Sequence, residues 1–151
     1  MPRSTRSAPS SLILVVDDDA LVRDMVAASL TRAGYRVVLA SDGAAAIDRL
    51  SRETPDLILT DLFMPNRDGI ELLRSGRLSR AGAPVIAMSG GYAGLDMLGA
   101  SEALGAAASI AKPFMPRELL ALVRRVLGEP DADAEPRAAS GPSGAVANAC
   151  R

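Results

Sequence analysis

The hydrophobic positions of this chain fall into short apolar runs separated by longer amphipathic segments. The runs are rich in Val, Ile and Leu, and the best of them show no polar alternation. Such runs are typical of strands that are buried on both faces of a parallel sheet. The pattern therefore predicts five strands, over residues 12–16, 36–40, 57–60, 84–88 and 109–111.

The segments between these runs have helical spacing. Helices are predicted over residues 20–33, 43–50, 69–78 and 117–127, with a weaker one near 96–104 in a glycine-rich and alanine-rich stretch. The first helix is expected to bury one stripe and to stop at Gly34; the stripe comprises Leu21, Val22, Met25, Val26 and Leu30. Asp19 and Asp42 are expected to act as N-caps. Strands that alternate with helices through short links indicate a doubly wound α/β sheet.

Composition divides the chain into one domain and two flanking segments. Residues 12–127 carry the periodic pattern, whereas 1–11 are polar and 128–151 are rich in Gly, Pro, Ala, Ser and acids. We expect both flanks to be disordered and the tail to be too short for an output domain. The net charge is −1, with no basic stripe, no span-length apolar run and no signal-peptide pattern. These features predict a cytoplasmic protein whose partners are neither nucleic acid nor membrane.

Two absences restrict the chemistry. The chain contains no histidine, and its single cysteine, Cys150, lies in the tail. Serine-type triads, cysteine–histidine dyads, histidine-bearing zinc sites and internal disulfides are thereby excluded. Any chemistry must use carboxylates, hydroxyls, lysine, arginine or a hard metal ion.

Polar residues follow several of the predicted strands. Ligands of doubly wound sheets bind beyond the carboxyl ends of the strands, where we expect these side chains to converge. The residues are Asp17 and Asp18 after the first run, Asp61 after the third, Ser89 after the fourth and Lys112 after the fifth.

Three carboxylates brought to one edge favour a cation. Two like charges about 4 Å apart repel by roughly 4 kcal/mol at an effective dielectric of about 20. An all-oxygen set made of Asp17, Asp18 and Asp61 suits Mg²⁺ or Mn²⁺. Asp61 closes a buried strand and, being ionised at neutral pH, can attack a phosphoryl group without a general base. Lys112 and Ser89 offer a charge and a hydroxyl to phosphate oxygens.

Over residues 12–127 the chain resembles the receiver domains of response regulators. The resemblance lies in four motifs, in the family's order and spacing: LVVDDD, DLILTDLFMPNRDGIELL, VIAMSGG and AKPF. It implies a flavodoxin-like fold, with five parallel strands in the order 2-1-3-4-5 and helices on both faces. It also implies a signalling domain that is no ordinary enzyme, but a phospho-acceptor that catalyses its own phosphorylation and slow dephosphorylation. The short tail, which departs from family members that carry an effector domain, predicts that this domain stands alone.

The resemblance assigns roles to the candidate residues. Asp61 would be phosphorylated, and Ser89 and Lys112 would contact the phosphoryl oxygens. Asp18, Asp61 and the backbone carbonyl of Phe63 would bind Mg²⁺, with Asp17 assisting through water. Lys112–Pro113 would be a cis peptide. The phosphodonor would be a histidine kinase or a histidine phosphotransfer protein, and the output would pass to a downstream protein target.

The sequence departs from the family pattern at three positions near the expected site. Ser109 stands where an aromatic residue often lies; Tyr92 either substitutes for it or is an exposed loop residue. Phe63 and Gly91 carry no polar side chain that could orient water, so we expect slow hydrolysis of an acyl phosphate.

Three alternatives remain open at this point. Residues 17–19 contain the D-x-D pattern of haloacid-dehalogenase-like phosphatases, which leaves the motif around Asp61 unexplained. A flavodoxin-like electron carrier shares the architecture but would need a phosphate loop where the aspartates stand. The third alternative is a receiver-like interaction module that is not phosphorylated.

Overall fold

The computed structural model describes residues 10–62, 71–72, 82–90, 102–103 and 105–130 of the chain. Its strands are β1 (Leu12–Val16), β2 (Arg36–Ala40), β3 (Leu57–Asp61), β4 (Val85–Gly90) and β5 (Ala108–Lys112). Its helices are α1 (Ala20–Arg32), α2 (Gly43–Arg52) and α6 (Pro116–Leu127). Each lies within a few residues of the range that the hydrophobic pattern predicts.

The strands form one parallel sheet in the order β2-β1-β3-β4-β5, as expected. Val16 pairs with Ala40 on one side and with Thr60 on the other. Asp61 lies beside Met88, and Gly90 lies beside Lys112. This register brings the carboxyl ends of all five strands to one edge, so the polar residues that follow them can meet there.

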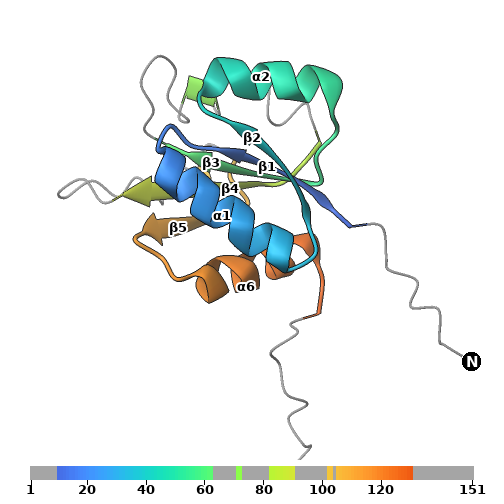
Figure 1. Ribbon diagram of the computed structural model, residues 1–151, viewed down its shortest axis with the longest axis vertical. Helices are drawn as coiled ribbons and strands as arrows, with labels where there is room; N and C mark the ends of the chain where they lie inside the picture. The colour runs from blue at the N-terminus through green and yellow to red at the C-terminus, as the bar shows by residue number, and fades with distance from the viewer. Residues whose placement is uncertain (1–9, 63–70, 73–81, 91–101, 104, 131–151) are drawn as a thin grey trace, which may run out of the picture.

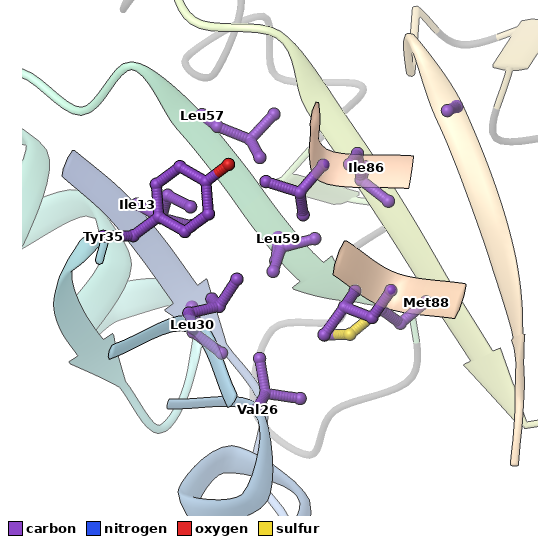
Figure 2. Packing of buried hydrophobic residues seen from close by; sticks show 12 residues of the cluster. Ile13, Val26, Leu30, Tyr35, Leu57, Leu59, Ile86 and Met88 are labelled. Carbon is purple, nitrogen blue, oxygen red and sulfur yellow. The ribbon is translucent and has the colours of Figure 1, made fainter. Parts of the chain in front are cut away.

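The sheet is covered on both faces: α2 lies over one, and α1 and α6 lie over the other (Figure 1). Successive side chains of a strand point to opposite faces, which divides the core into two clusters. On the α2 face, Leu14 and Ile58 pack with Ala46. The other face buries a larger apolar cluster, shown in Figure 2: Ile13, Val26, Leu30, Tyr35, Leu57, Leu59, Ile86 and Met88.

The helix ends follow their sequence signals. Asp19 Oδ1 accepts a hydrogen bond from the amide of Leu21 at 2.9 Å, and Asp42 Oδ1 accepts one from Ala45 at 2.7 Å. Both predicted N-caps are therefore confirmed. Gly34 takes a positive φ of 98°, the left-handed conformation that favours glycine after a helix.

The predicted stripe of α1 is too wide. Val26 and Leu30 are fully buried, but Leu21 is 81% exposed and Met25 is 36% exposed. Residues four apart follow one line along a helix, so Val22, Val26 and Leu30 face the sheet while Leu21 and Met25 lie about 100° to the side. The expectation that all five would be buried is wrong for these two.

Some expectations fall on residues that the structure does not describe. Of the predicted helix over 69–78 only Glu71 and Leu72 are described, and both are helical; Leu72 is buried. The expectations for Phe63, Gly91, Tyr92, segment 1–9 and segment 131–151 lie outside the described residues. None of the described helices is both long enough and apolar enough to span a bilayer.

Candidate functional site

The polar residues predicted at the strand ends gather at the carboxyl edge of the sheet. Asp17 follows β1 directly, Asp61 closes β3, and Ser89 and Lys112 lie at the ends of β4 and β5. Asp17 is fully buried, and Asp61 and Ser89 are 6% and 3% exposed. Asp18 is exposed and lies at the mouth of the site. The carboxyl edge of the sheet thus holds two buried carboxylates and a buried hydroxyl.

Asp17 is held from several directions. Its Oδ1 accepts a hydrogen bond from the amide of Asp19 at 2.9 Å, and its Oδ2 accepts one from Lys112 Nζ at 2.7 Å. Its backbone amide donates to Ala40, and its carbonyl accepts from Arg23 Nη1 at 2.8 Å. A buried carboxylate is tolerated only when it is paired and hydrogen-bonded. This network fixes Asp17 in one orientation.

Lys112 joins the acids of two strands. Its Nζ lies 2.7 Å from Asp17 Oδ2 and 3.3 Å from Asp61 Oδ2, and its side chain is 18% exposed. Burial lowers the pKa of Lys112, but the hydrogen bond to Asp17 and the charges of Asp17 and Asp61 raise it by more, so the pKa lies above its ordinary value. Lys112 is therefore a permanent cation at neutral pH.

The three aspartates have the geometry of a cation site. One carboxylate oxygen from each of Asp17, Asp18 and Asp61 lies within 4.8 Å of the others. Three carboxylates and the Lys112 ammonium leave a net charge of −2, which a divalent ion would balance. Carboxylate oxygens are the ligands that Mg²⁺ and Mn²⁺ prefer. The fourth expected ligand, the carbonyl of Phe63, lies outside the described residues.

Ser89 and the residues around β5 complete the site. Among the residues that the structure describes, the Ser89 hydroxyl donates one long hydrogen bond, 3.4 Å, to the carbonyl of Gly90. The Lys112–Pro113 peptide is cis, as the resemblance implies. Ser109, at the position where an aromatic residue was expected from the family, donates to Glu102 Oε1 at 3.2 Å.

Sequence reasoning missed one residue of the site. Arg23 lies in the first turns of α1, half-buried, and its guanidinium binds the backbone of Asp17. A basic residue six positions after a strand-end acid gives a weak signal. The position of Arg23 becomes informative only when the structure shows that α1 packs so that this side chain reaches the backbone at the end of β1.

Comparison with known proteins agrees with this geometry. Residues 13–124 match the response regulator receiver domain family. A CheY-like receiver domain protein from Methanospirillum hungatei superimposes with a TM-score of 0.72 at 34% identity, covering 79% of this chain and 94% of that one. The chemotaxis response regulator CheY4 of Vibrio cholerae gives 0.70 at 30% identity, covering 78% and 98%.

Curated relatives include longer proteins. The chain is 38% identical over 125 residues to response regulator MprA of Mycobacterium avium, covering 82% of this chain and 54% of that protein. It is 37% identical over 115 residues to the alkaline phosphatase synthesis transcriptional regulatory protein PhoP of Bacillus subtilis, covering 76% and 48%. The chain thus spans about half the length of these relatives.

The fold is a doubly wound parallel sheet that gathers three aspartates and a lysine at its carboxyl edge, as expected for a receiver domain. The chain belongs to the response regulator receiver domain family of two-component systems. This membership rejects the alternatives of a haloacid-dehalogenase-like phosphatase and a flavodoxin-like electron carrier.

Proposed function

We propose that the chain receives a phosphoryl group on Asp61 from a histidine kinase or a histidine phosphotransfer protein, in a Mg²⁺-dependent reaction. The observation that carries the proposal is the position of the Lys112 ammonium between Asp17 Oδ2 and Asp61 Oδ2. Asp18 adds an oxygen within metal-binding reach of both acids.

The chemistry is an in-line displacement. A carboxylate oxygen of Asp61 forms a bond to phosphorus as the phosphorus–nitrogen bond of the donor phosphohistidine breaks, and the imidazole leaves. Lys112 and the Ser89 hydroxyl then bind the phosphoryl oxygens. When bound by the aspartates, Mg²⁺ supplies charge neutralisation of the phosphoryl group. Asp17 holds Lys112 in place through its hydrogen bond.

The output of the phosphorylated domain is proposed to pass by protein contact. Phosphorylation would redistribute pre-existing conformations of the domain and so change the surface that a target recognises. The PhoP relative carries a name that describes a transcriptional regulator. The expectation that nucleic acid is not among the partners therefore stays a prediction, as does the cytoplasmic location.

Incubation with acetyl phosphate and Mg²⁺, followed by intact-mass measurement, tests the proposal. The wild-type chain should gain the mass of one phosphoryl group, and Asp61→Asn should gain none. Asp48→Asn is the matched control, because Asp48 is an exposed aspartate on α2 that does not belong to the acid cluster. Chelation of Mg²⁺ should abolish the gain. A mass gain that persists in Asp61→Asn would show that the phosphoryl acceptor is another residue.

A further inference from the structure

Asp18 is held in place differently from the other two acids of the site. Asp17 and Asp61 are buried and bind Lys112. Asp18 is exposed, and within the described part of the chain its carboxylate forms no hydrogen bond and no ion pair. One of its oxygens nevertheless lies within 4.8 Å of oxygens from both other acids. The backbone on either side of Asp18 therefore decides whether its carboxylate reaches a cation.

Arg23 binds the backbone on both sides of Asp18. Its guanidinium Nη1 donates to the carbonyl of Asp17 at 2.8 Å, and its amide donates to the carbonyl of Asp19 at 2.9 Å. The amide bond is the first hydrogen bond of α1 and does not need the Arg23 side chain. The guanidinium bond does need it, and the carbonyl that it binds belongs to the peptide between Asp17 and Asp18. The side chain of Arg23 therefore fixes this peptide relative to α1.

Asp17 keeps other contacts when the guanidinium bond is removed. Its amide donates to the carbonyl of Ala40 at 3.2 Å, and its Oδ1 accepts from the amide of Asp19 at 2.9 Å. Its Oδ2 accepts from Lys112 Nζ at 2.7 Å. The carboxylate of Asp18 has no such second anchor among the described residues. Loss of the guanidinium should therefore displace Asp18 more than Asp17.

The charge of Arg23 acts on the site in the opposite direction from its hydrogen bond. Among the described residues, no carboxylate forms an ion pair with Arg23, so this cation does not neutralise the acids. A cation near a metal site repels the metal, and removal of the charge alone should therefore strengthen metal binding. Removal of the hydrogen bond should weaken it. The sign of the change in metal affinity separates the two effects.

We propose that Arg23 is a positioning residue for the cation site. Through the carbonyl of Asp17 it holds the Asp18 carboxylate where this acid can bind Mg²⁺ together with Asp17 and Asp61. The inference rests on the proposed Mg²⁺-dependent function. Groups that orient metal ligands without touching the metal contribute about 10- to 100-fold to metal affinity. Arg23 acts on one ligand of several, so we expect the lower figure, about tenfold.

Direct binding of Mn²⁺ to the full-length chain tests the proposal without any phosphorylation. The electron paramagnetic resonance signal of free Mn²⁺ reports the affinity. Arg23→Met and Arg23→Gln each remove the guanidinium, and the affinity should fall about tenfold in both. Arg49→Met is the matched control, because Arg49 donates to the carbonyl of Leu39 at 3.3 Å and its removal takes away the same charge without touching residues 17–19. The affinity of this control should be unchanged or slightly higher.

The route through Asp18 is tested by a double-mutant cycle. In an Asp18→Ala background there is no carboxylate left to position, so Arg23→Met should cause no further loss of Mn²⁺ affinity. Circular dichroism of every variant, recorded at the temperature of the titration, keeps loss of fold apart from loss of affinity; Arg23→Gln serves if Arg23→Met does not fold.

Three results would overturn the proposal. Affinity that is unchanged or higher in the Arg23 variants would show that this side chain does not position a ligand. An equal loss in the Asp18→Ala background would show that Arg23 does not act through Asp18. A wild-type chain that binds no Mn²⁺ would overturn the cation site of the proposed function as well, whereas the first two results leave that function standing.

Discussion

Replacing Lys112 with methionine removes the cation between Asp17 and Asp61 while keeping most of the side-chain volume. Removing one partner of a buried ion pair costs about 3–5 kcal/mol, because the remaining charge is left without compensation. Lys112 is 18% exposed, so water reaches part of the site and we take the lower figure, about 3 kcal/mol. For a domain of this size the melting temperature should fall by about 12 °C, at roughly 4 °C per kcal/mol.

Mg²⁺ should reverse much of this loss. A ligand that binds only the folded state stabilises it by about 2.7 kcal/mol at one hundred times its Kd. In the variant the carboxylates of Asp17 and Asp61 no longer share their charge with an ammonium, so Mg²⁺ should bind more tightly to the variant than to the wild type. The stability gap between the two proteins should therefore narrow as Mg²⁺ is added.

Thermal and urea unfolding of both proteins, with EDTA and with saturating Mg²⁺, measure this gap. Arg117→Met, a substitution at an exposed cation of α6, is the matched control and should change stability little. The raised pKa of Lys112 means that its contribution is complete below the unfolded-state pKa, about 10.4, and is lost as the pH rises through the folded-state value. A gap that Mg²⁺ leaves unchanged would refute the assignment of the acid cluster as a cation site.

Two further predictions follow from single residues. Burial, and then the hydrogen bond to Glu129, raise the pKa of Tyr35 to about 12. In a Tyr92→Phe background Tyr35 is the single tyrosine, so an ultraviolet titration of the phenol should show this midpoint. Glu129→Gln should lower the pKa of Tyr35 only partly, because burial is the larger cause. The contribution of the neutral Tyr35 phenol to the free energy of unfolding is fully present below about pH 10, and it is lost as the pH rises toward 12. Phe63→Asn and Gly91→Glu should shorten the lifetime of the acyl phosphate on Asp61, measured by loss of the added mass; an unchanged lifetime would show that these positions do not limit hydrolysis.

Much of the site could be predicted because each strand of this fold is identified by a short local stretch of sequence. Each apolar run identifies a strand, and in a parallel sheet the residue after each strand lies at the same edge. That rule predicts from the sequence alone that Asp17, Asp61 and Lys112 lie close together. It could not say which acid would hold the lysine most closely, because the 2.7 Å contact with Asp17 joins residues 95 positions apart.

The sequence by itself determined the strands, most helix limits, the two faces of the core and the family. These properties depend on periodicity, which records how each side chain points relative to its near neighbours. Only the tertiary structure decided that Leu21 is exposed, that Arg23 binds Asp17, and that Tyr35 binds Glu129 across 94 positions. Such contacts depend on how whole elements pack, since no local pattern encodes the distance between two segments that are far apart in the chain.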